Sequence, residues 1–204
     1  MKKPEVLVVP TGTANLASVI AGLARAGADA VVAADPGRVL DAERVVLPGV
    51  GALGAAMRKL SNSRLAEALA TRVREGRPTL AVCLGLQILC ESSAESPGVR
   101  GLGIIECRVE KFSGAVRVPQ IGWNQVEARG CRLVESGYAY FANSYRVCEP
   151  PAGWSAAFSD HGGRFVAALE RGRVLACQFH PELSGGWGLA LIRRWLEQDR
   201  GALC

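Results

Sequence analysis

Short apolar runs alternate with helix-like stretches along the first half of the chain. The runs lie at residues 6–9, 30–33, 45–47 and 79–82. Between them, apolar residues recur with helical spacing at 16–23, 53–60 and 65–73, and a further helix begins at 84–90. Asn15 precedes the first of these helices and can cap it. Buried strands that alternate with helices predict βαβ units and a largely parallel sheet.

The pattern changes in the second half. Short β-like runs separated by Gly, Pro and Asp occupy residues 104–112, 123–127, 138–142, 154–158, 165–170 and 173–178. A hairpin is expected around Gly172, and a last helix from about 188 to 198. We therefore predict one α/β domain spanning 1–204, with a mostly parallel central sheet flanked by helices and an antiparallel β insertion.

Composition excludes several classes of protein. The 204 residues are 49% hydrophobic, which is enough for a real core and excludes global disorder. No apolar run approaches the roughly 18 residues that a membrane-spanning helix needs. Pro4, Glu5 and Pro10 confine the N-terminal run to residues 6–9, too short for a signal peptide. We expect a soluble protein of the cytoplasm that does not contact the membrane.

The net charge and the cysteine content do not indicate a particular function. The net charge is +5, but no Lys/Arg-rich run occurs, so nucleic-acid binding is not expected. A basic face toward an acidic protein or a phosphorylated substrate fits equally well. The seven cysteines are scattered without a Cys-x-x-Cys pair, so neither a zinc site nor a disulfide framework is predicted. No metal and no cofactor are expected.

Cys83 is the first candidate for chemistry. It stands between the run 79–82 and a helix, with Gly85 two positions later. Small residues around such a corner permit the sharp turn of a nucleophile elbow, here with Cys in place of Ser. A thiol at a helix N-terminus also has its thiolate stabilised by backbone amides. The alternative is a buried cysteine at the end of a strand.

Two further segments fit the chemistry of a cysteine nucleophile. His180 ends a strand expected to face the elbow, and Glu182 follows in an extended, Pro-containing segment that can orient it. His180 could instead be a surface histidine before a helix. The bend at 47–51 could aim backbone N–H groups at an oxyanion, with the N–H of Leu84 as the second donor. A phosphate loop or a plain turn remains an alternative for that bend.

Taken together, these segments carry a family resemblance. The run Cys83-Leu-Gly-Leu-Gln87 and the later Phe179-His180-Pro-Glu182 resemble the class I glutamine amidotransferases. The resemblance implies a flavodoxin-like fold, a Cys83–His180–Glu182 triad, and hydrolysis of L-glutamine to glutamate and ammonia. It implies oxyanion N–H donors at Val50 and Leu84. The glutamine-binding residues that it implies are Gly51, Gln87, Glu95, Tyr140 and Ser144.

Segments 15–19, 47–57, 118–124 and 180–185 further resemble one branch of the family, the glutaminase subunits of imidazole glycerol phosphate synthases. That branch implies a heterodimer with a (β/α)8-barrel cyclase. The cyclase takes up the ammonia and makes imidazole glycerol phosphate and AICAR in histidine biosynthesis. The resemblance also implies a glutaminase that is nearly silent until the partner binds its own ligand. Trp123 is then a candidate interface anchor, or else a core aromatic at a strand end.

Two alternative functions remain, and two segments differ from the usual family pattern. The chain could serve another synthase, such as that of pyridoxal phosphate, or be a non-enzymatic relative with Cys83 as a redox sensor. Pro10-Thr11-Gly12 stands where the family usually has Asp-Tyr-Gly, and Ala142-Asn143-Ser144-Tyr145 where it usually has Val-His-Ser-Tyr. The second departure lies near the expected glutamine pocket.

Overall fold

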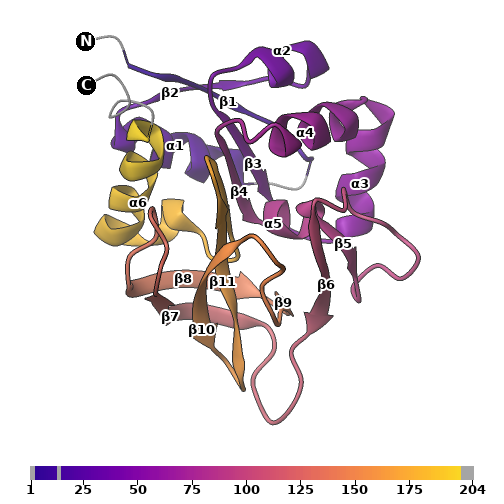
Figure 1. Cartoon of the computed structure of the whole chain (residues 1–204), viewed down its shortest axis with the longest axis vertical. Helices are drawn as coiled ribbons and strands as arrows, with labels where there is room; N and C mark the ends of the chain where they lie inside the picture. Colours follow the sequence, from indigo (N-terminus) through magenta and orange to yellow (C-terminus); the bar gives the residue numbers. More distant parts are fainter. Residues whose placement is uncertain (1–2, 13–14, 199–204) are drawn as a thin grey trace.

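A computed structural model describes residues 3–12 and 15–198 of the chain. Parallel strands form one half of its main sheet (Figure 1). In spatial order they are β2 (Asp29–Val32), β1 (Glu5–Val8), β3 (Val45–Gly49), β4 (Thr79–Cys83) and β12 (Val174–Cys177). This half confirms the parallel sheet that the alternating pattern predicts.

Antiparallel strands continue the same sheet beyond β12. They are β11 (Arg164–Arg171), β10 (Ser155–Asp160), β7 (Gln120–Ala128) and β8 (Gly137–Asn143). The β11–β12 hairpin turns at Gly172, whose φ of +58° suits glycine. Off this path, β6 (Ile105–Lys111) pairs with β5 (Cys90–Ser93) and β9 (Tyr145–Val147). The pairs β10–β11, β7–β10, β7–β8 and β6–β9 confirm the antiparallel insertion, whereas β5 pairs with β6 in parallel. The sequence does not predict β5 and β9, because each has only three or four residues.

Helices cover both faces of the parallel half. Alternate residues of β1 point to opposite faces, as a strand requires. Val6 and Val8 share a core with α1 (Leu16–Ala26) and α6 (Gly185–Glu197), and Leu7 shares the other with α3 (Leu53–Asn62) and α4 (Leu65–Arg74). Figure 1 shows α1 and α6 together on one side and α3 and α4 on the other. The carboxyl ends of the parallel strands meet at one sheet edge, where ligands of such folds bind.

Helix ends follow the local chemistry. The Asn15 side chain accepts a hydrogen bond from the backbone N–H of Ser18, which confirms the predicted cap. The sequence does not predict α2 (Pro36–Asp41), because six residues do not make a periodic pattern. Asp35 and Pro36 still mark its start, through a side-chain cap and a proline in the first turn.

A buried arginine holds the segment after α2. Arg72 of α4 is fully buried, and its guanidinium donates to the carbonyls of Val39, Leu40, Ala42, Glu43 and Pro78. Burial lowers the pKa of Arg72 to about 10, and the nearby Arg77 and Arg173 contribute to the lowering. The side chain therefore ties α2, the segment between α2 and β3, and the residue before β4 to α4 from within the core.

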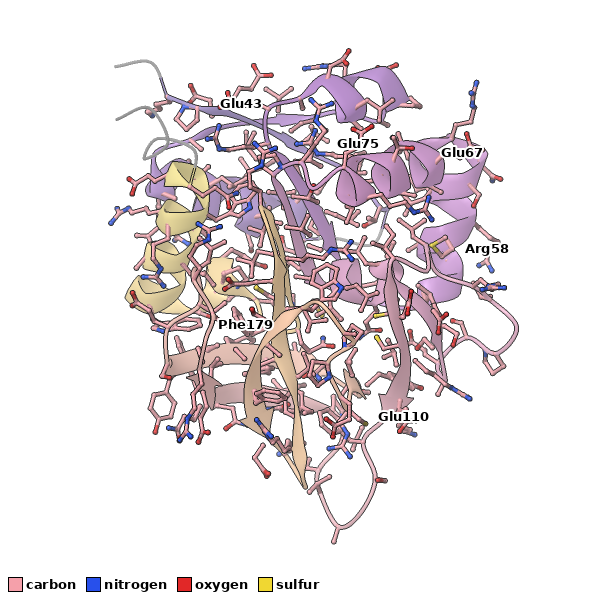
Figure 2. All side chains as sticks on the ribbon, viewed as in Figure 1. Glu43, Arg58, Glu67, Glu75, Glu110 and Phe179 are labelled. Atoms are coloured by element: carbon pink, nitrogen blue, oxygen red, sulfur yellow. The ribbon has the colours of Figure 1, made fainter. Side chains whose placement is uncertain are left out.

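Charged side chains lie mainly on the outside. In Figure 2, Arg58 of α3 and Glu67 of α4 project outward, while Phe179 lies inside, beneath the helices. The Phe179 ring makes edge contacts with Phe141 and Trp187. None of the helices within 3–12 and 15–198 has the length and apolar character needed to cross a membrane.

Candidate active site

Cys83 occupies a strained turn between β4 and α5 (Leu84–Leu89). Its φ is +54° and its ψ −107°, a conformation that costs a non-glycine residue free energy. Gly85 makes the turn possible, because a Cβ there would lie 2.0 Å from the carbonyl oxygen of Leu47 on β3. The structure therefore confirms the predicted elbow and lifts the thiol to the edge of the sheet.

The register of β12 brings His180 to the same edge. Cys177 pairs with Val82, so the residues after β12 run beside Cys83. His180 is buried, and its Nδ1 lies 2.9 Å from Oε1 of Glu182. The expected extended segment is wrong: residues Pro181–Leu183 form a 3₁₀ turn, which folds the Glu182 carboxylate back under the ring.

Close packing fixes Glu182. Gly22 of α1 faces it so closely that a Cβ at this glycine would lie 2.8 Å from the Cβ of Glu182. Arg25 of the same helix donates to the backbone carbonyl of Glu182. The carboxylate itself is buried, so it is held against His180 with little access to water.

Backbone hydrogen bonds fix His180. Its N–H donates to the carbonyl of Tyr140 on β8 at 2.9 Å, and its own carbonyl accepts from the Ser184 hydroxyl. Ser184 Oγ in turn accepts from the N–H of Tyr140. Tyr140 thus holds the His180 segment through its main chain.

The electrostatics favour a charged imidazole. Burial lowers the pKa of His180, but hydrogen bonds to Cys83 and Glu182 and their negative charges raise it more, to about 10. The ring therefore carries a proton at neutral pH between a sulfur and a carboxylate. A cysteine beside such an imidazolium can attack a carbonyl carbon with its sulfur, and the ring can then protonate the leaving group.

A cavity of about 190 Å³ opens beside the thiol. Most of the predicted site residues line it, namely Val50, Gly51, Cys83, Leu84, Gln87, Glu95 and Ser144. Ala142, Asn143 and Tyr145 line it as well; they belong to the departure from the family pattern that is expected near the glutamine pocket, although the sequence gives them no role. Tyr140, predicted to bind glutamine, is not among the lining residues; its ring packs edge-on against Trp123.

Asn143 carries a feature that no motif indicated. Its Nδ2 donates to the carbonyl of Tyr145 at 2.9 Å, whereas its buried Oδ1 has no hydrogen-bond partner among the described residues. The residue that replaces the usual histidine therefore lines the cavity while its side-chain oxygen is buried and unsatisfied.

The bend after β3 is held from two sides. Thr11 donates to the carbonyl of Pro48 at 3.1 Å, so the first departure from the family pattern contacts this bend directly. On the other side, Glu95 accepts from the N–H of Leu53 and Ser96 from that of Gly54, in the first turn of α3. Val50 and Gly51 lie between these anchors, which fix the backbone expected to supply the oxyanion donor.

Trp123 lies on an exposed ribbon. Its side chain is 57% exposed, and Ile121 and Tyr138 of the same β7–β8 ribbon are 67% and 61% exposed. A solvent-facing indole excludes the alternative of a core aromatic. We call Ile121, Trp123 and Tyr138 the aromatic patch. An apolar patch of this kind on a surface typically marks an interface.

Within the part of the chain that the structure describes, no three His, Cys, Asp or Glu side chains are grouped so that they could hold an ion.

Comparisons of sequence point to one family. The model of the glutamine amidotransferase class-I family matches residues 23–197. "Imidazole glycerol phosphate synthase subunit HisH" of Methanothermobacter thermautotrophicus is 40% identical over 94% of this chain and 98% of the relative. A HisH subunit of Thermus thermophilus is 41% identical over the same shares. The chloroplastic hisHF protein of Arabidopsis thaliana is 37% identical over 94% of this chain, which matches 34% of that longer protein.

Comparisons of structure agree on the fold. A crystal structure of a glutamine amidotransferase superposes with a TM-score of 0.77 at 20% identity, covering 96% of this chain and 98% of the other. A chain of PurLQS from Thermotoga maritima superposes with a TM-score of 0.72 at 16% identity, covering 97% and 99%.

Proposed function

The chain belongs to the class-I glutamine amidotransferase family, and we propose that it is the glutaminase subunit of an imidazole glycerol phosphate synthase. The observation that carries the proposal is near full-length identity of about 40% to subunits of that name, together with a buried histidine–carboxylate pair beside an elbow cysteine. The same relatives favour this synthase over that of pyridoxal phosphate.

The proposed reaction begins at the thiolate. Cys83 attacks the side-chain carboxamide carbon of glutamine, and the N–H groups of Val50 and Leu84 stabilise the oxyanion. The His180 imidazolium gives its proton to the departing ammonia, which leaves a glutamyl thioester on Cys83. His180, now neutral, takes a proton from the water that hydrolyses the thioester, and glutamate is released. Glu182 fixes the tautomer of the ring and stabilises its charged form.

The same cavity supports the placement of the substrate. We propose that Gly51, Gln87, Glu95 and Ser144 hold glutamine there, with the Glu95 carboxylate suited to the α-ammonium group. All four line the cavity beside the thiol. Tyr140 has a different role, because its backbone holds His180 and its ring supports Trp123.

The partner proposed for the aromatic patch is a (β/α)8-barrel cyclase that consumes the ammonia. The patch is connected to the triad through Tyr140. The Trp123 ring packs on Tyr140 with ring centroids 6.3 Å apart, and the Tyr140 carbonyl accepts the N–H of His180. Only Tyr140 lies between the patch and His180, the proposed catalytic base. A protein that binds the patch can therefore change the position of His180 and so raise the rate of glutamine hydrolysis. We propose the cytoplasm as the site of this reaction.

Glutamate release tests the proposal. The purified chain is assayed alone, with a matched cyclase, and with that cyclase plus its phosphorylated ligand, and the Cys83→Ala variant serves as the blank. We expect weak release alone and strong release in the ligand-bound complex. Equal release in all three conditions would indicate a freestanding glutaminase. No release in any condition, with ready oxidation of Cys83, would favour a redox sensor.

A further inference from the structure

Gln178 lies next to the nucleophile but belongs to none of the residues assigned so far. It directly follows β12, and the register that pairs Cys177 with Val82 sets it beside Cys83. Its side chain is completely buried, and its backbone N–H donates to the carbonyl of Ala167 at 2.8 Å. A buried amide must satisfy its polar atoms within the protein. The partners of this amide are therefore informative.

Both polar ends of the amide have a partner. Its Oε1 accepts from Nε2 of Gln87 at 3.2 Å, and its Nε2 donates to Sγ of Cys83 at 3.6 Å. The first bond sets the direction of the second. As the two amides are oriented, Gln87 donates an N–H to the oxygen of Gln178, which leaves the NH₂ group of Gln178 facing the sulfur.

We propose that Gln178 is a further catalytic residue, which donates an N–H to the Cys83 sulfur and stabilises it as the thiolate. The inference rests on the proposed function only in naming the reaction that this thiolate carries out. Hydrogen bonds to a charged acceptor are stronger than those to a neutral one, so the bond favours thiolate over thiol. His180, which directly precedes the 3₁₀ turn, forms a side-chain hydrogen bond to the same sulfur. The sulfur is thus held by two donors.

Gln87 connects the hydrogen bond between Gln178 and Cys83 to the cavity proposed to hold the substrate. It lines the cavity beside Cys83 and at the same time orients the Gln178 amide. A ligand that fixes Gln87 therefore also fixes the donor on the sulfur. Gln87 acts on the thiolate through Gln178, so in this role it is a positioning residue.

The test measures alkylation of Cys83 by iodoacetamide as a function of pH, followed by mass spectrometry of the labelled peptide. Gln178→Met removes both polar atoms at similar volume, and Gln178→Glu keeps the acceptor for Gln87 but replaces the donor by an oxygen. We expect each variant to lower the alkylation rate at neutral pH by about 10- to 100-fold, the loss of one hydrogen bond to a charged group. In each Gln178 variant, the pH at which alkylation of Cys83 becomes fast is higher than in the wild type.

Gln120→Met is the matched control. Gln120 is also a buried glutamine, but it does not line the cavity, and its Oε1 has no partner among the described residues. We expect its alkylation profile to match that of the wild type. Thermal unfolding identifies variants that do not fold, and either Gln178 variant alone suffices for the test. Wild-type alkylation rates at all pH values in a folded Gln178 variant would overturn the proposal.

The assay separates this inference from the proposed function. Iodoacetamide needs neither glutamine nor a partner, so a slow Gln178 variant supports the hydrogen bond even if the wild type proves unable to release glutamate. If glutamate release in the complex is normal while alkylation is indifferent to Gln178, the function stands and the inference fails.

Discussion

Replacing Glu182 by glutamine tests how the histidine keeps its proton. The substitution keeps the size of the side chain but removes the negative charge 2.9 Å from Nδ1 of His180. Both side chains are buried, so solvent screens their interaction little. A hydrogen bond between charged groups contributes roughly 1.5–3 kcal/mol, which corresponds to a fall of about one to two in the pKa of His180.

The raised pKa of His180 determines how stability and activity depend on pH. The pKa of His180 is about 10, above its ordinary 6.5, so protonation stabilises the folded state fully below pH 6.5. That contribution is lost as the pH rises through about 10. The imidazolium, which supplies the proton to ammonia, is lost over the same range. In Glu182→Gln the alkaline decline of kcat/KM therefore moves to roughly pH 8–9, because the pKa of His180 falls by about one to two.

The assay is the pH profile of kcat/KM for glutamine, measured in the complex from about pH 6 to beyond pH 10. Glu67→Gln, an exposed position on α4, is the control and should keep the wild-type profile. An alkaline decline that stays near pH 10 in Glu182→Gln would refute the reasoning, whatever happens to the turnover number.

Three further predictions concern other parts of the molecule. Arg72→Met should lower the free energy of unfolding in urea by at least about 3 kcal/mol, because several buried carbonyls lose their donor, whereas the exposed Arg74→Met should change it little. Ser96→Ala removes the acceptor of the Gly54 N–H and should reduce kcat roughly fivefold with KM unchanged, as steady-state kinetics can show. Trp123→Ala should weaken cyclase binding about 30-fold or more in calorimetry, while iodoacetamide labelling of Cys83 continues at the wild-type rate.

The sequence predicted those parts of the structure that depend on local chemistry. Buried parallel strands are continuous apolar runs, so β1, β3 and β4 stand out, and Asn15 identifies the start of α1. The elbow could be predicted because Gly85 is required by a close approach to the Leu47 carbonyl. Such features need only a few neighbouring residues to be recognised.

What the sequence did not predict depends on contacts between distant segments. The 3₁₀ turn after His180 forms against α1 through Gly22, and no residue within the turn signals that contact. Tyr140 was expected in the pocket because the family resemblance implied it, whereas the position of β8 directs its ring to Trp123. Gln178 lies beside Cys83 only through the β4–β12 register, which joins residues 95 apart in the chain.

The most direct test of the central claim is to identify the covalent intermediate. The complex is mixed with glutamine, quenched in acid during turnover, and the Cys83 peptide is examined by mass spectrometry. We predict a glutamyl group in thioester linkage on Cys83, absent from Cys83→Ala and released by hydroxylamine. Continued glutamate release by Cys83→Ala, or a glutamyl group on another residue, would contradict the account.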